Sequence, residues 1–200
     1  METYQGVKFN HLKVKDDFNF DHRLTELNQL AYLFSQLGLT PVHPEGAYGN
    51  QSYRTTPSSF IVTKSGMIPD NELDIANYCE IAGYTAESTT FLTHGPSLPS
   101  SESFLHYDIY MNRPHINVIL HGHSKILNDY AKKLSIPTTE TFYDYGTQEL
   151  AQSALDLAQK EILFFILKDH GFVALGSSIK ETGSLVLDYY GRLINLIKAI

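Results

Sequence analysis

The stretch "INVILHGHS", residues 116–124, joins an apolar run to two histidines. Its β-branched and apolar residues predict a buried strand that ends among the glycine and polar residues. Residues i and i+2 of a strand point to the same face, so His121 and His123 can approach one common object. That object can be a metal ion, although a surface or hydrogen-bonded histidine pair has the same spacing.

A zinc site needs three or four protein ligands, so further ligands must come from elsewhere in the chain. His170 is the best third candidate, because it stands at the mouth of another apolar strand and is followed by a glycine that allows a tight bend. Glu102 is the best oxygen donor or proton carrier, since the helix that it begins leads into the strand of His121. His106 lies four residues after Glu102 on the same predicted helix face, where it can orient the carboxylate or cover a neighbouring strand.

Regular elements are predicted on both sides of this strand. Leucines at helical spacing follow Asp21, a good N-cap, and Gly38 suits the end of that helix. Residues 1–20 are predicted to form an N-terminal arm, and residues 1–200 a single domain. The other predicted elements are strands at 50–55, 59–66, 78–85, 89–95, 116–124 and two within 161–178, and helices at 99–114, 124–134, 147–160 and 179–200.

The composition narrows the classes of partner. The net charge is -7 and no basic cluster is present, which argues against nucleic acid and anionic membrane as partners. No apolar run approaches the length of about 18 residues needed to cross a bilayer. Cys79 is the single cysteine, and "METYQGVKFN" has neither a signal core nor a transit-peptide bias, so we expect a cytoplasmic protein whose partners are small molecules or proteins.

Three short polar loops predict an anion-binding pocket. The stretch "EGAYGNQSYR" (45–54) has glycines that can turn backbone N–H groups toward an anion. "TKSG" (63–66) adds a hydroxyl and a glycine after a strand, and "PSSE" (99–102) places serines at a helix N-terminus, where phosphate is favoured. Each loop alone is equally compatible with an ordinary connection, but the three together suggest one pocket.

The order of these pieces resembles the class II aldolase/adducin family over most of the chain. The matching stretches are "GAYGNQSYR", "IVTKSG", "LPSSE", "SFLHYDIYMNRP", "NVILHGHS", "YGTQEL" and "DHGFVALGSSIKET". The resemblance implies an α/β fold, three-layer α/β/α with a mainly antiparallel central sheet, and a homotetramer with active sites at subunit boundaries.

The resemblance also implies a role for individual residues. Zn²⁺, or another divalent metal, would be held by His121, His123 and His170, and Glu102 would be the catalytic acid/base. The residues that would hold the substrate phosphate are Gly49, Asn50, Ser65, Gly66, Ser100 and Ser101.

The implied function is a zinc-dependent lyase that cleaves a small phosphorylated sugar to dihydroxyacetone phosphate and an aldehyde through an enediolate. Two alternatives stay open: an epimerase or dehydratase that uses the same metal site, and a non-catalytic adducin-like interaction module. The module is disfavoured because such domains typically lose the metal histidines. The stretch before "YGTQEL" is shorter than in the aldolases that carry a proton-donating tyrosine there, and spacing does not assign that role to Tyr130, Tyr143 or Tyr145.

Overall fold

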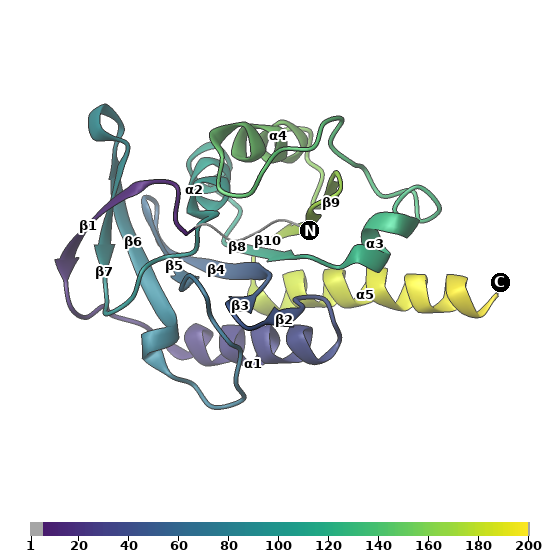
Figure 1. Ribbon diagram of the computed structural model, residues 1–200, viewed down its shortest axis with the longest axis horizontal. Helices are drawn as coiled ribbons and strands as arrows, with labels where there is room; N and C mark the ends of the chain where they lie inside the picture. The colour runs from purple at the N-terminus through teal and green to yellow at the C-terminus, as the bar shows by residue number, and fades with distance from the viewer. Residues whose placement is uncertain (1–5, 200) are drawn as a thin grey trace.

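The fold is an eight-stranded sheet covered by helices on both faces (Figure 1). The computed structural model describes residues 6–199. The strands run in the order β1-β7-β6-β5-β4-β8-β10-β9, and all neighbours are antiparallel except β1 and β7. Their bounds are β1 (Asn10–Lys15), β4 (Gly49–Thr56), β5 (Ser59–Thr63), β6 (Tyr78–Thr85), β7 (Thr90–His94), β8 (Val118–Gly122), β9 (Phe164–Leu167) and β10 (Gly171–Gly176). The prediction of a mainly antiparallel sheet is confirmed.

Within the residues that the structure describes, five α-helices complete the layers. The helices α1 and α5 lie on one face of the sheet, and α2 and α4 lie on the other (Figure 1). A small hairpin of β2 (Val42–His43) and β3 (Gly46–Ala47) precedes β4. The helix bounds are α1 (His22–Gln36), α2 (Ser103–Asn112), α3 (Lys125–Tyr130), α4 (Gln148–Ala158) and α5 (Ile179–Lys198), with single 3-10 turns at η1 (Ile75–Asn77) and η2 (Ala86–Ser88).

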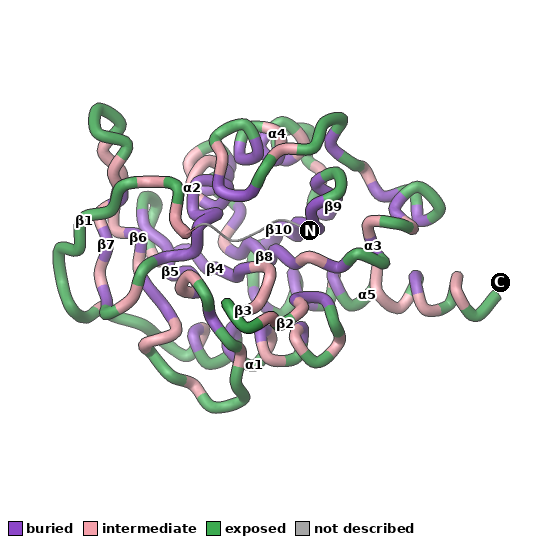
Figure 2. Tube along the Cα trace, in the orientation of Figure 1, coloured by how far each residue is buried: buried purple, intermediate pink, exposed green. Residues whose placement is uncertain are grey.

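Strand β8 shows how the sequence pattern builds two cores. Val118 and Leu120 join the core beneath α1 and α5, whereas Ile119 joins the core beneath α2 and α4. This period-two alternation places His121 on the face of α2. Burial is therefore concentrated in the central strands and on the inner sides of the helices (Figure 2), and the histidine lies between the central sheet and a covering helix.

The predicted helix after Asp21 is confirmed. The Asp21 side chain accepts a hydrogen bond from the backbone N–H of Arg23, and Gly38 adopts a positive φ of 69° just after the helix ends. Leu24, Leu27 and other apolar residues of α1 are fully buried. Within residues 6–199, no helix is long and apolar enough to cross a membrane.

Three features differ from the sequence predictions or add to them. Strand β1 lies inside the predicted N-terminal arm and pairs with β7 as an exposed edge strand; residues 1–5 of that arm lie outside the described residues. The β2–β3 hairpin was not predicted, because strands of two residues are too short for a periodic pattern. Helix α2 begins at Ser103 rather than at residue 99, so the serines of "PSSE" precede its first turn.

Candidate functional site

Four side chains from three parts of the fold converge at one end of the central strands. Glu102 is the N-cap residue of α2, His121 lies in β8, His123 follows β8, and His170 lies in the turn between β9 and β10. One ligand atom from each of the four lies within 4.8 Å of the others. The structure therefore brings together all four residues that the sequence predicted as metal ligands or proton carrier.

The donor atoms of this cluster face one another closely. The distance from Glu102 Oε1 to His170 Nε2 is 2.8 Å, and the distance from Glu102 Oε2 to His121 Nε2 is 3.1 Å. His123 Nε2 lies 3.0 Å from His121 Nε2 and 3.9 Å from Glu102 Oε2. Imidazole nitrogens and carboxylate oxygens are both ligands of Zn²⁺, and three imidazoles alone make up some catalytic zinc sites.

A hydrogen bond outside the cluster fixes the proton on His121. The Nδ1 atom of His121 lies 2.7 Å from the backbone oxygen of Phe172. A carbonyl oxygen only accepts, so Nδ1 carries the proton and donates it. With Nδ1 holding that proton, a ring that binds a metal ion does so as neutral imidazole and offers the ion its Nε2 lone pair. These residues fit a divalent metal ion.

The electrostatics of the cluster also suit a cation. Burial alone would raise the pKa of Glu102, but the interactions with His121, His170 and His123 outweigh burial and hold that pKa well below its usual value. Burial lowers the pKa of His123 to about 3. At neutral pH the cluster thus contains an ionised carboxylate and a neutral His123, the protonation states that bind metals.

The turn that carries His170 is built differently from the prediction. The residue with a positive φ in this turn is Asp169, at 55°, and not Gly171. Gly171 is instead needed for close approach, because a Cβ atom there would lie 2.4 Å from the backbone oxygen of Gly122. The absence of a side chain at Gly171 lets β10 lie against β8, so that His170 reaches the other ligands.

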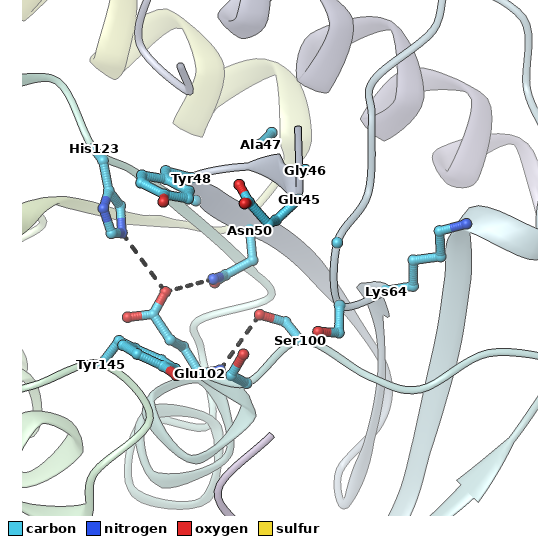
Figure 3. A pocket seen from close by; sticks show the side chains of 14 residues that line it. Glu45, Gly46, Ala47, Tyr48, Asn50, Lys64, Ser100, Glu102, His123 and Tyr145 are labelled. Carbon is cyan, nitrogen blue, oxygen red and sulfur yellow. Dashed lines mark hydrogen bonds and ion pairs between the residues drawn. The ribbon is translucent and has the colours of Figure 1, made fainter. Parts of the chain in front are cut away.

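The three polar loops predicted to bind an anion line one pocket beside this cluster (Figure 3). The loops touch through glycine: Gly46 has a φ of 126°, and a Cβ atom there would lie 2.5 Å from the backbone of Gly66. Backbone hydrogen bonds join Ser65 N–H to Leu98 and Ser100 N–H to Thr63. Eight predicted residues line the pocket, namely Gly49, Asn50, Ser65, Gly66, Ser100, Ser101, Glu102 and His123.

The side chain of Asn50 is engaged inside the protein. Its Nδ2 atom donates to Glu102 Oε2 over 2.7 Å, and its Oδ1 atom lies 2.5 Å from His106 Nε2. Asn50 thus links the pocket to the carboxylate, and its predicted contact with a phosphate group stays a prediction. His106 touches Glu102 through Asn50 rather than directly.

Sequence reasoning did not assign several residues to the pocket wall, although Tyr145 was one of three tyrosines left open as proton donors and Lys64 lies in the predicted phosphate turn. Tyr145, 7% exposed, lies beside Glu102, and the amine of Lys8 lies 3.9 Å from the centre of its ring (Figure 3). The chain separation of 43 residues from Glu102 left no pattern that could place Tyr145 there. Tyr48 and Glu45 also line the pocket, and their position within the glycine-rich loop was the available signal. Lys64 lines it too, but its amine points away from Glu102 (Figure 3).

Comparison with curated sequences and comparison with solved structures both find aldolases that are similar to this chain. The curated L-fuculose phosphate aldolase of Methanococcus vannielii is 37% identical over 97 residues, which cover 42% of this chain and 52% of that protein. The L-fuculose phosphate aldolase of Methanocaldococcus jannaschii is 34% identical over 95 residues, which cover 40% and 51%. The match therefore spans about half the length of these curated relatives.

Solved structures share the fold. An L-fuculose 1-phosphate aldolase superposes with a TM-score of 0.69 at 22% identity, covering 90% of this chain and 88% of that chain. A sugar-phosphate aldolase from Thermotoga maritima has a TM-score of 0.69 at 17% identity, covering 89% and 96%. The family model of the Class II Aldolase and Adducin N-terminal domain matches residues 26–187. Since that match covers most of the chain, the protein belongs to the class II aldolase and adducin family.

Proposed function

We propose that this chain is a metal-dependent lyase that cleaves a small phosphorylated sugar to dihydroxyacetone phosphate and an aldehyde through an enediolate. One observation carries the proposal: Glu102 and His123, two members of a cluster of three imidazoles and a carboxylate, line one end of a pocket whose other end consists of hydroxyl and glycine loops. The first end suits the oxygens of a carbonyl compound, and the second suits a phosphate group.

His121, His123 and His170 would hold the metal, with zinc as the expected ion. When bound, it supplies Lewis-acid charge to the carbonyl and hydroxyl oxygens of the substrate. The backbone oxygen of Phe172 holds the ring of His121 in place, which keeps the ligand geometry fixed before a substrate arrives.

Glu102 would carry the proton of the reaction. In the condensation direction, the ionised carboxylate removes a proton from the carbon next to the ketone, which gives the enediolate. In the cleavage direction, the hydroxyl group on the carbon that becomes the aldehyde gives up its proton to water and the electrons of the broken carbon–carbon bond enter the enediolate. Glu102, after taking a proton from water, returns it to the same carbon. The low pKa of Glu102 holds it ionised in the protein without substrate, which is the form that accepts a proton in the condensation direction.

The loops would bind the phosphate group. The hydroxyls of Ser100 and Ser101 lie just before the N-terminus of α2, where the partial positive charge of the helix favours an anion. Gly46 and Gly66 hold the loop of Ser65 against the glycine-rich loop. A homotetramer, implied by the family resemblance, and a cytoplasmic location, in keeping with a single cysteine, complete the proposal.

Metal analysis and product identification test this proposal together. The full chain is purified without chelator, its metal content is measured by elemental analysis, and a panel of phosphorylated ketoses is screened for release of dihydroxyacetone phosphate. We expect about one zinc per chain, loss of that zinc in His123→Ala, and release of the product by the wild type. Turnover that instead yields an inverted or dehydrated sugar phosphate identifies an epimerase or dehydratase. A protein that binds no divalent metal after zinc reconstitution would falsify the catalytic assignment.

A further inference from the structure

Behind the pocket, β4 and α2 face each other through a continuous row of buried polar side chains. Asn50 and Ser52 alternate on β4 and so point to the same face, while Glu102, His106 and Tyr110 follow at intervals of four on α2. Two residues of a strand rise about 6.6 Å and four residues of a helix about 6.0 Å, so the two rows stay in register. All five side chains are at most 5% exposed. We call this row the β4–α2 ladder.

Each step of the ladder is a short hydrogen bond. Tyr110 Oη lies 2.8 Å from Ser52 Oγ, and Ser52 Oγ lies 2.6 Å from His106 Nδ1. On the other side of the ring, His106 Nε2 lies 2.5 Å from Asn50 Oδ1. The Asn50 amide then donates to Glu102 Oε2 over 2.7 Å. The ladder therefore ends on the carboxylate of the candidate acid/base.

The donor and acceptor chemistry of these atoms fixes which group donates at each step of the ladder. An ionised carboxylate only accepts, so the NH₂ group of Asn50 must face Glu102, and the amide oxygen faces His106. That oxygen also only accepts, so His106 Nε2 carries the proton. Burial lowers the pKa of His106 to about 3, so the ring is neutral and Nδ1 accepts from the hydroxyl of Ser52. Ser52 has then used its proton and accepts the hydrogen bond from Tyr110.

We infer that His106 is a positioning residue that acts through Asn50: held in the Nε2–H tautomer by Ser52, it aims the amide of Asn50 at Glu102. If the ring were turned to the Nδ1–H tautomer, Asn50 would be free to flip and place its oxygen against the carboxylate. The carboxylate would then lose a charge-assisted hydrogen bond and gain a repulsive contact. His106 also stacks on Phe60, with 6.3 Å between ring centres, which fixes the plane of the ring.

The tautomer is tested directly by NMR on the full chain labelled with ¹⁵N-histidine, without any substrate. We expect the ring nitrogens of His106, assigned by comparison with His106→Gln, to show a protonated Nε2 and an unprotonated Nδ1 at neutral pH. In Ser52→Ala, which removes the donor to Nδ1, the two tautomers should both be populated. A protonated Nδ1 or a cationic ring in the wild type overturns the inference, whatever reaction the protein catalyses.

Kinetics test the consequence for Glu102, and this arm rests on the proposed function. His106→Leu keeps an apolar contact to Phe60 but removes both ring hydrogen bonds, so we expect kcat to fall by about 10–100-fold, with zinc content unchanged. His106→Gln retains an amide donor near the position of Nε2 and should recover most of that loss. The KM of the substrate should change less than kcat in both variants, because the residues of the loops at 63–66 and 99–102 are unchanged and only the predicted phosphate contact of Asn50 is affected.

A matched control separates positioning from packing. Tyr78→Phe removes another buried hydrogen bond, that from Tyr78 Oη to Asn28 Oδ1 over 2.8 Å, in the core beneath α1 and α5. It should lower the melting temperature about as much as His106→Leu but leave kcat unchanged. Equal kcat in wild type and His106→Leu, or no recovery in His106→Gln, overturns the positioning role. A wild type that cleaves no phosphorylated sugar refutes the proposed function instead, and the tautomer measurement then decides the inference alone.

Discussion

The two ends of the pocket are built by different means. At the histidine end, the side chains of Glu102, His121 and His170 are at most 7% exposed and meet within hydrogen-bonding distance. At the loop end, backbone contacts such as that between Gly46 and Gly66 form the wall. Chemistry at the histidine end depends on the identity of the side chains. Binding at the loop end depends on the backbone conformation that the glycines allow. Substitutions at the two ends should therefore change different quantities.

The largest effect is expected at the histidine end. In Glu102→Gln the side chain keeps its size but cannot exchange a proton, so kcat should fall by about 10²–10⁴-fold. The three histidines remain, so zinc content should persist and KM should change little. Steady-state kinetics with elemental analysis check this result. A Glu102→Gln enzyme with near wild-type kcat would show that the carboxylate is not the proton carrier.

The next effect concerns the backbone of the loop end. In Gly46→Ala the new Cβ atom would lie 2.5 Å from the backbone of Gly66, at a φ of 126° that disfavours any side chain. We expect the free energy of unfolding to fall by about 1–3 kcal/mol and KM to rise, while zinc content stays that of the wild type. Urea denaturation and kinetics measure both quantities.

Gly191→Ala is the matched control for that variant. Gly191 lies in α5, with no atom within 4 Å of an added Cβ. Because alanine is the better helix former, this change should raise the free energy of unfolding by up to about 1 kcal/mol and leave KM unchanged. If Gly46→Ala were as well tolerated as Gly191→Ala, the loop end would not depend on the glycine contact.

An effect of similar size, but confined to substrate binding, is expected for a single hydroxyl. Ser100→Ala removes one donor from the predicted phosphate site, and a hydrogen bond to a charged group contributes about 1.5–3 kcal/mol. KM should therefore rise by about 10-fold or more, with kcat within threefold of the wild type. The effect should disappear with an analogue that lacks the phosphate group. A fall in kcat with unchanged KM would place Ser100 in the chemistry rather than in binding.

The same contrast explains what the sequence could predict. The periodic patterns of α1, β8 and α5 located these elements, and the side-chain chemistry of His121, His123 and Glu102 identified candidates that the structure brings together. Residue identity named the candidates, because few residue types can bind a metal, and the family resemblance joined them into one site.

The features that the sequence did not predict depend on distance and backbone conformation. Tyr145 comes to the pocket from a loop that has no periodic pattern, and the positive φ of the turn before β10 falls on Asp169 rather than on a glycine. The position of His106 on the helix face was predictable, but its hydrogen bonds required the register of β4 against α2. Such facts follow from tertiary contacts that a single sequence does not specify.

The smallest effect tests a second carboxyl of α2, outside both ends of the pocket. Burial raises the pKa of Asp108 to about 6, and no ionic partner offsets this shift as the histidines do for Glu102. A carboxyl whose folded pKa is raised binds its proton more tightly in the folded state, so wild-type stability falls as pH rises from about 4 to 6. Above about pH 6 the buried carboxyl is ionised, and the loss of folding stability is complete.

Asp108→Asn removes this penalty. Because Asp108 is only partly buried, solvent screening limits the expected gain in the free energy of unfolding at pH 7 to about 1 kcal/mol, and the gain should vanish near pH 4. Urea denaturation at the two pH values measures the difference, and zinc content and kcat should match the wild type. An equal gain at both pH values would mean that packing rather than charge is responsible. A pH-dependent gain without a change in kcat would show that the pKa values of the two carboxyls are set independently. Burial sets the pKa of Asp108, and the neighbouring histidines set that of Glu102.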